Sequence, residues 1–163
     1  MKPGSTPAVF LDITFLLPFF QLEIAVKDFT IEDFKEFLTK VSEIHVSELS
    51  IFEAKAKLFS LSRKNAAYIE ALENFGNNLT VIRNDERFVF HPYTGQNDAH
   101  FNLISAKEWK LDSFDIIILA QALEVELLIT EDEEILNLRD QETFVQDPHL
   151  GKLAIRRWRE LRQ

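Results

Sequence analysis

Short apolar runs alternate with amphipathic segments along the chain, a pattern typical of strands that alternate with helices. Residues 8–12 form an apolar run that ends in a carboxylate, which predicts a buried strand with Asp12 at its C-terminal edge. Residues 43–47 and 127–130 predict two further short strands. The alternation predicts an α/β fold, a three-layer α/β/α sandwich with a central, mainly parallel sheet.

The segments between these strands carry apolar residues at helical spacing and polar residues where helices begin. Thr130 and Glu133 form a capping box, so we expect a helix to begin there with Asp132 in its first turn. The other expected helices span about residues 19–26, 31–41, 48–61, 63–74, 98–109 and 115–125, three of them capped by Thr30, Ser47 and Ser113.

Two stretches of the chain are less regular. Residues 79–82 and 88–90 are β-prone and flank the polar residues 83–87, which predicts either a strand or a hairpin appended to the sheet. The pattern does not distinguish the two. Near the C-terminus, residues 143–146 predict a last strand and residues 152–162 predict a last, basic helix.

The composition is that of a globular protein. The chain has 163 residues, 46% of them hydrophobic, so we expect residues 1–163 to form a single domain with a substantial core. The absence of cysteine excludes disulfides, thiolate zinc sites and cysteine nucleophiles, and it fits a cytoplasmic location. Residues 13–20 are too short an apolar stretch to span a membrane, and residues 1–7 do not resemble a signal peptide. We therefore expect a soluble protein without a membrane partner.

The formal net charge of -9 is unfavourable for binding nucleic acid, because affinity for phosphates comes mainly from lysine and arginine. The charge is uneven, since residues 152–163 have a local balance of +4 and leave -13 on the rest of the chain. An arginine-rich last helix is equally consistent with a solvated surface or with a segment that complements the acidic body. The candidate RNA contacts in this segment are Lys152, Arg156, Arg157 and Arg159.

Three aspartates fall independently where the carboxyl end of a strand, or a loop, leads into a helix: Asp12, Asp115 and Asp132. In an open α/β sheet, ligands bind in the crevice at this edge. Each aspartate taken alone is explained by the general preference for aspartate at helix starts. Only their combination indicates a functional site.

Glu53 is a fourth candidate, because it lies in the middle of a predicted helix, beyond any capping role, with Leu49 and Ala56 as apolar neighbours. The helical pattern does not exclude Glu48, although its place in the first turn is already explained by the helix dipole. Four converging carboxylates form a hard, oxygen-rich site that suits Mg²⁺ or Mn²⁺ rather than zinc. A divalent ion would relieve their repulsion and can activate water against a phosphodiester.

Four segments resemble the ordered motifs of PIN domains: residues 10–14 (FLDIT), 47–53 (SELSIFE), 115–123 (DIIILAQAL) and 128–132 (LITED). The resemblance spans roughly residues 8–146. It implies that Thr14 and Thr130 orient ligands or water beside the acids, and Asp112 is a supporting group, an alternative ligand or a loop acid. The acidic quartet implied by the resemblance is Asp12, Glu53, Asp115 and Asp132.

The same resemblance implies a metal-dependent endoribonuclease, in which activated water attacks RNA in line at phosphorus and leaves 5′-phosphate and 3′-hydroxyl ends. Many family members are toxins of toxin–antitoxin pairs and are often dimeric, so an antitoxin protein and a second copy of the chain are the suggested partners. The chain is longer than a minimal toxin of this family, chiefly around residues 79–97 and at the C-terminus. That length bears on the antitoxin and the dimer more than on the chemistry.

Three alternatives compete with this hypothesis. The sequence Asp12-x-Thr14 also resembles the phosphatases of the haloacid-dehalogenase type, but these place a second acid where Thr14 stands, and no convincing lysine motif precedes Asp132. A PIN-like module that binds RNA or a protein without cutting is the stronger alternative. Catalysis by histidine is poorly supported, because the histidines are scattered without close pairing: His45, His91, His100 and His149.

Overall fold

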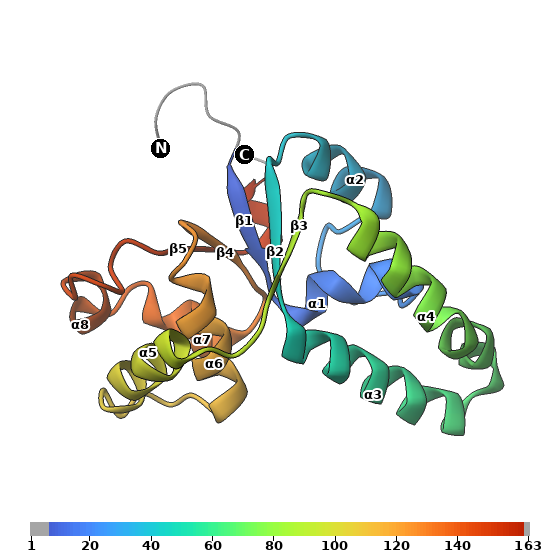
Figure 1. Ribbon diagram of the computed structural model, residues 1–163. Helices are drawn as coiled ribbons and strands as arrows, with labels where there is room; N and C mark the ends of the chain where they lie inside the picture. Colours follow the sequence, from blue (N-terminus) through green and yellow to red (C-terminus); the bar gives the residue numbers. More distant parts are fainter. Residues whose placement is uncertain (1–6, 162–163) are drawn as a thin grey trace.

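The structure is a computed structural model that describes residues 7–161, and in that range it contains one five-stranded sheet (Figure 1). All the strand pairings are parallel, which confirms the expected α/β fold. Residues 1–6 and 162–163, which include most of the segment tested for a signal peptide, lie outside the described residues. The strands are β1 (Ala8–Leu11), β2 (Glu43–Ser47), β3 (Phe88–His91), β4 (Leu127–Ile129) and β5 (Ala154–Arg156), in the order β3-β2-β1-β4-β5.

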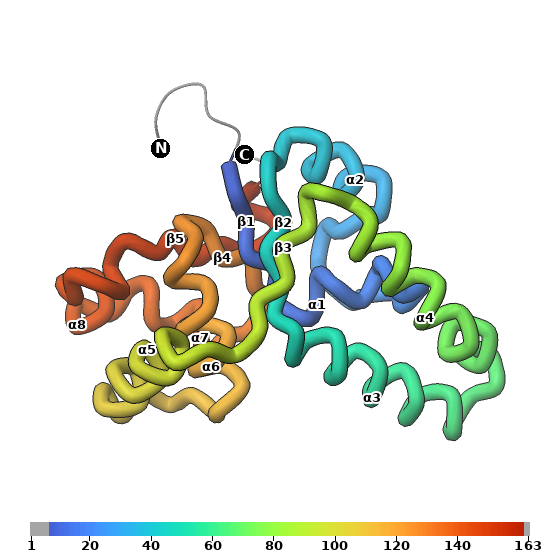
Figure 2. The backbone as a smooth tube through the Cα atoms, in the orientation of Figure 1, coloured from blue at the N-terminus to red at the C-terminus, as the bar shows by residue number. Residues whose placement is uncertain are grey.

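Helices cover both faces of the sheet, and Figure 2 shows the two groups on opposite sides of it. One group contains α1 (Ile13–Leu16), η1 (Leu17–Phe20), α2 (Ile31–Thr39), α3 (Glu48–Lys64), η2 (Ala66–Tyr68) and α4 (Ile69–Asn84). The other contains α5 (Gly95–Ser105), α6 (Ser113–Ala122), α7 (Glu133–Leu138) and α8 (Glu142–Val145). No helix within residues 7–161 is long and apolar enough to cross a membrane.

Two hydrophobic cores lie between the sheet and these helix groups. Val9 and Leu11 of β1 belong to one core and Phe10 to the other, because successive side chains of a strand point to opposite faces. All three side chains are fully buried. The sheet is therefore covered on both sides, as the three-layer prediction requires.

The carboxyl ends of the central strands lie at one edge. β1 pairs with β2 as Leu11 opposite Val46, and with β4 as Leu11 opposite Ile129. The amide of Asp12 donates to the carbonyl of Ile129 at 3.1 Å, so the ladder continues one residue past β1. Asp12 and Thr130, which follow β1 and β4, are thereby adjacent at this edge.

The middle of the chain differs from the prediction. The β-prone residues 79–82 belong to the long helix α4, so β3 is the strand and no hairpin forms there. Packing overrides local propensity, because Phe75 and Ile82 bury one face of α4 and Phe75 stacks on Phe20 with ring centroids 4.1 Å apart. The helix predicted for residues 19–26 ends at Phe20, where Gln21 takes a left-handed φ of 63°.

The C-terminal prediction is reversed in the structure. Residues 143–146 overlap α8 rather than a strand, and the basic helix expected over residues 152–162 is wrong. The segment instead forms β5, in which Ile155 pairs with Leu128, followed by the 3₁₀ turn η3 (Trp158–Leu161). The burial of Ile155 and Trp158 explains the strand, because β5 extends the sheet and the indole fills the core.

Candidate active site

Asp12 is buried at the carboxyl end of β1 and is held by two hydrogen bonds. Its Oδ1 accepts from the amide of Ile13 at 2.7 Å and thereby caps α1, while its Oδ2 accepts from the hydroxyl of Thr130 at 2.7 Å. Burial raises the pKa of Asp12, and the two hydrogen bonds oppose that rise. The side chain is therefore fixed in position, with a weakened preference for its ionised form.

Asp132 caps α7 and does not lie in its first turn. Its Oδ1 accepts from the amides of Glu134 and Ile135 at 2.9 and 3.1 Å. The predicted cap at Thr130 is wrong, because the Thr130 hydroxyl accepts from the amide of Asp132 at 3.0 Å and donates to Asp12 instead. Thr130 thus links two of the candidate acids.

Asp112 and Asp115 form a capping box at the start of α6. Asp112 Oδ1 accepts from the amides of Phe114 and Asp115 at 2.8 and 2.9 Å, and Asp115 Oδ2 accepts from the amide of Asp112 at 3.1 Å. Asp112 therefore replaces the predicted cap Ser113, which is exposed. Burial raises the pKa of Asp115 to about 6, and the charges of Asp132, Asp112 and Asp12 act in the same direction.

The structure distinguishes Glu53 from Glu48. Both carboxylate oxygens of Glu48 accept from the guanidinium of Arg83, at 3.1 and 2.9 Å, so its charge is already paired. Glu53 faces the other acids, and partial burial followed by the charges of Asp12, Asp112 and Asp115 raises its pKa. Glu53 is the acid that α3 brings to the site.

These side chains line one pocket of about 380 Å³ beyond the carboxyl ends of the strands. The four predicted acids and Thr14 are among its lining residues, and Thr130 is buried behind Asp12. Among residues 7–161, six carboxylates and no lysine or arginine line the pocket. The full lining consists of Asp12, Ile13, Thr14, Glu53, Asp112, Phe114, Asp115, Ile118, Glu131 and Asp132.

The donor set of the pocket fits a hard divalent cation. Among the described residues, all the charged groups of the lining are carboxylates, which suit Mg²⁺ or Mn²⁺. Burial first, and the neighbouring carboxylates after it, raise the pKa of Glu53 and Asp115. Within residues 7–161, however, no three carboxylate or imidazole groups are already close enough together to hold an ion. Binding would have to draw these carboxylates closer, which a cation favours by neutralising them.

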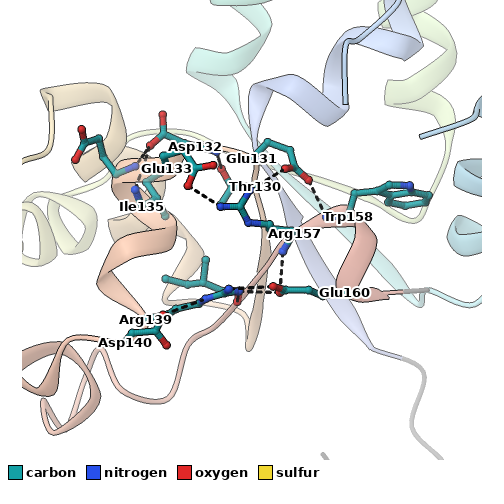
Figure 3. A network of polar contacts seen from close by, with 12 residues as sticks. Thr130, Glu131, Asp132, Glu133, Ile135, Arg139, Asp140, Arg157, Trp158 and Glu160 are labelled. Atoms are coloured by element: carbon teal, nitrogen blue, oxygen red, sulfur yellow. Dashed lines mark hydrogen bonds and ion pairs between the residues drawn. The ribbon is translucent and has the colours of Figure 1, made fainter. Parts of the chain in front are cut away.

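Some charged side chains of the C-terminal segment, residues 152–161, form ion pairs within the protein (Figure 3). Arg157 pairs with Glu133 and lies 3.9 Å from Glu131, and the amide of Trp158 donates to Glu131 at 2.9 Å (Figure 3). Arg139 forms a two-bond pair with Glu160. For Arg157, the interpretation as a partner of the acidic body is therefore correct.

The other candidate RNA contacts are exposed, and two of them, Lys152 and Arg156, line a cavity separate from the acidic pocket. Lys152, Arg156 and Arg159 are all exposed. Lys152 lines a separate cavity with Ala8 and Glu43, which begin β1 and β2, so it lies toward the opposite end of the sheet from the acidic pocket. Arg156 ends β5, beside the carboxyl end of β4, but it lines the same cavity as Lys152 rather than the acidic pocket.

His45 and His91 form a close pair, which contradicts the predicted scatter of the histidines. Nδ1 of His45 lies 2.7 Å from Nε2 of His91, and both rings are buried. The outer nitrogens contact Glu43 at 3.0 Å and Glu124 at 3.1 Å. The sequence alone does not reveal the pair, because it depends on how β3 pairs with β2. With that register, His45 opposite Val89 places His91 two residues further along on the same face.

The sequence matches no family model and no curated protein, but its fold is similar to solved structures. One similar chain comes from the crystal structure of VapBC2 from Rickettsia felis bound to a promoter DNA fragment. It superposes on this chain with a TM-score of 0.58 at 14% sequence identity. The match covers 93% of this chain and 98% of that one. PAE2754 from Pyrobaculum aerophilum gives a TM-score of 0.52 at 13% identity, over 93% and 91% of the two chains.

These likenesses concern the fold, because both identities are low. Together with the parallel sheet and the order of its elements, they confirm the PIN-type α/β/α fold that the four motifs predicted. The chain is thus PIN-like at the level of fold, and its activity is a separate question.

Proposed function

We propose that the chain is a metal-dependent endoribonuclease, with Asp12, Glu53, Asp115 and Asp132 as ligands of Mg²⁺ or Mn²⁺. The observation that carries the proposal is that these four acids, from four distant parts of the sequence, line one pocket of about 380 Å³. Capping explains the position of three of them but not their convergence with Glu53, which caps nothing.

The chain's own groups have distinct roles in this proposal. Asp12 and Asp132 are anchored by hydrogen bonds to helix amides and to Thr130, so the ends of β1 and β4 hold them in fixed relation. Asp12, Glu53 and Asp115 all have raised pKa values, so a neutralising cation would favour their ionised forms. When bound, a divalent ion supplies Lewis acidity and an acidified water for phosphodiester hydrolysis.

The partners of the protein belong to the same proposal. We propose a toxin that is held by a protein antitoxin, as the PIN resemblance implied, and the fold likeness to a chain of VapBC2 supports this. A cytoplasmic location fits the absence of cysteine. The resemblance also supports a homodimer. The proposed substrate is RNA, cut to 5′-phosphate and 3′-hydroxyl ends.

Cleavage of a mixed RNA pool, with Mn²⁺ or Mg²⁺ titrated from zero, tests the proposed activity. We expect cleavage that requires the ion, is abolished by EDTA and leaves 5′-phosphate ends. Glu53→Gln should abolish it, whereas Glu48→Gln, on the same helix but paired with Arg83, is the matched control and should retain it. Equal activity of the two variants would contradict the assignment of Glu53.

The alternatives predict different results. A folded protein that binds the RNA pool but never cuts it, at any ion concentration, would favour the non-cleaving module. A covalent aspartyl-phosphate on Asp12 would revive the phosphatase, although the pocket lining within the described residues holds no lysine.

A further inference from the structure

One aromatic ring stands at the acidic pocket. Phe114 lines the pocket directly before Asp115, and its side chain is 50% exposed. Its backbone is fixed, because the amide of Phe114 donates to Oδ1 of Asp112 at 2.8 Å within the capping box. The ring is therefore held by a rigid helix start rather than by a loose loop.

The ring of Phe114 has no aromatic partner within residues 7–161, whereas many of the buried phenylalanines pack against other rings. Phe15 and Phe34, for example, both contact Trp158 at ring-centroid distances of 6.2 and 5.7 Å. Phe59 is equally exposed, at 50%, but the guanidinium of Arg63 lies 5.5 Å from its ring centroid. Phe114 thus offers an open aromatic face beside the acids.

The charge of the pocket makes this face important for any nucleotide that enters. In the described part of the chain, six carboxylates and no basic side chain line the pocket. Two nearby cations are already paired, Lys110 with Glu134 at 2.9 Å and Arg157 with Glu133. The charged side chains of this lining therefore repel a phosphate, whereas the apolar ring of Phe114 offers a nucleobase a stacking surface that does not depend on charge.

We propose that Phe114 stacks on an unpaired nucleobase next to the phosphodiester presented to the acids, and so positions the RNA and requires it to be single-stranded at that point. The inference rests on the proposed ribonuclease function. Stacking requires an exposed base face, which a base inside a duplex does not offer. Phe114 acts as a substrate-positioning residue, separate from the proposed metal ligands.

Steady-state cleavage of a short single-stranded RNA in Mg²⁺, by wild type and Phe114→Leu, tests the role of the ring. We expect KM to rise about five-fold or more with kcat nearly unchanged, because stacking stabilises bound substrate and transition state alike. Phe114→Tyr should restore KM, and Phe59→Leu, an equally exposed phenylalanine outside the pocket, should leave it unchanged. An unchanged KM in Phe114→Leu would overturn the proposal.

RNAs that each lack one base distinguish stacking by Phe114 from a general effect of the substitution on protein structure. Removing single bases in turn near the cleavage site should raise KM at one position for wild type and have no further effect on Phe114→Leu. If both proteins respond equally at every position, Phe114 is not the stacking residue.

Failure of the proposed function is distinguishable from failure of this inference. If wild type cuts no RNA in Mg²⁺, the ribonuclease proposal fails, and the intact RNA can carry 2-aminopurine at each position in turn. Quenching of that fluorophore by wild type and Phe114→Tyr but not by Phe114→Leu would still support stacking. Equal quenching by all three would overturn it.

Discussion

The hydroxyl of Thr130 donates a 2.7 Å hydrogen bond to Oδ2 of Asp12 and so joins the carboxyl ends of β4 and β1. The same oxygen accepts from the amide of Asp132 at 3.0 Å. One buried side chain therefore sets the relation between two of the four proposed ligands. It also opposes the rise in the pKa of Asp12 that burial causes, because the bond favours the carboxylate.

Thr130→Val removes this hydroxyl and keeps the branched shape of the side chain. We expect the affinity for Mn²⁺ to fall about ten-fold, because partners that orient ligands typically contribute a factor of this size. Calorimetric titration with Mn²⁺ measures it. Thr130→Ser keeps the hydroxyl and is the control, so a loss in the serine variant equal to that in the valine variant would show that packing, rather than the hydrogen bond, is responsible.

Asp115→Asn should stabilise the metal-free protein at pH 7.5 by about 1 kcal/mol. Burial and neighbouring acids raise the folded-state pKa of Asp115 to about 6, and its partial solvation limits the gain from removing the charge. The amide oxygen of asparagine can still accept from the amide of Asp112. Urea unfolding in EDTA measures the change, and a variant less stable than wild type would contradict it.

The raised pKa of Asp115 also predicts how the stability of the metal-free protein depends on pH. A carboxyl whose folded-state pKa is raised contributes stability that is fully present below its unfolded pKa, near 3.8, and is lost as the pH rises through about 6. The stability difference between wild type and Asp115→Asn in EDTA should therefore shrink as the pH is lowered from 7.5 to 4.5. A difference that stays constant over this range would show that Asp115 has an ordinary pKa.

The sequence was sufficient to predict the fold class and the edge at which Asp12 lies, because strands buried on both faces leave a continuous apolar run. It was insufficient for helix α4, because residues 79–82 include three β-branched side chains in a row, yet the tertiary packing of Phe75 and Ile82 decides their structure. The prediction also missed the C-terminal strand β5, because the local pattern was not decisive there either. Its three residues among arginines carry too short a pattern to distinguish a strand from a helix.

The candidate site shows the same division. The convergence of Asp12, Asp115 and Glu53 on one pocket was predictable from strand ends and motif order. The sequence already favoured Glu53 over Glu48, through the helix dipole and the PIN resemblance. The independent reason, an ion pair of Glu48 with Arg83, lies 35 residues away on another helix and needed the structure. Sequence patterns are local, so none of them reveals an ion pair between side chains of two distant elements.

The exposed arginines predict how the affinity for RNA depends on salt concentration. If Arg156 and Arg159 contact RNA phosphates, their double replacement by glutamine should reduce the slope of log affinity against log salt by about 1.4. Arg157→Gln is the control and should leave the slope unchanged, because Arg157 is paired with Glu133. Filter binding at several salt concentrations measures the slopes. Deleting the whole segment is uninformative, since it would remove the buried Trp158.

The pair of His45 and His91 predicts a coupled loss of stability. Replacing either residue by alanine leaves its partner's ring nitrogen buried without a hydrogen bond, which should cost about 1–3 kcal/mol. The double variant should lose less than the sum of the two, because the second change removes the group that the first left unpaired. Urea unfolding of the four proteins measures the coupling, and strictly additive losses would contradict the hydrogen bond.

The pair also predicts a pH dependence of opposite sign to that of Asp115. Burial lowers the pKa of His91, more than the nearby Glu124 raises it, and the charge of a protonated His45 acts in the same direction as burial. The unfolded chain therefore binds the proton first, and stability is lost as the pH falls below about 6.5. The measurement uses the Asp115→Asn background, which removes the opposing pH effect of Asp115. There, the loss of stability between pH 7.5 and 5.5 should be larger in the protein that keeps His91 than in His91→Gln. An equal loss would show that another group titrates.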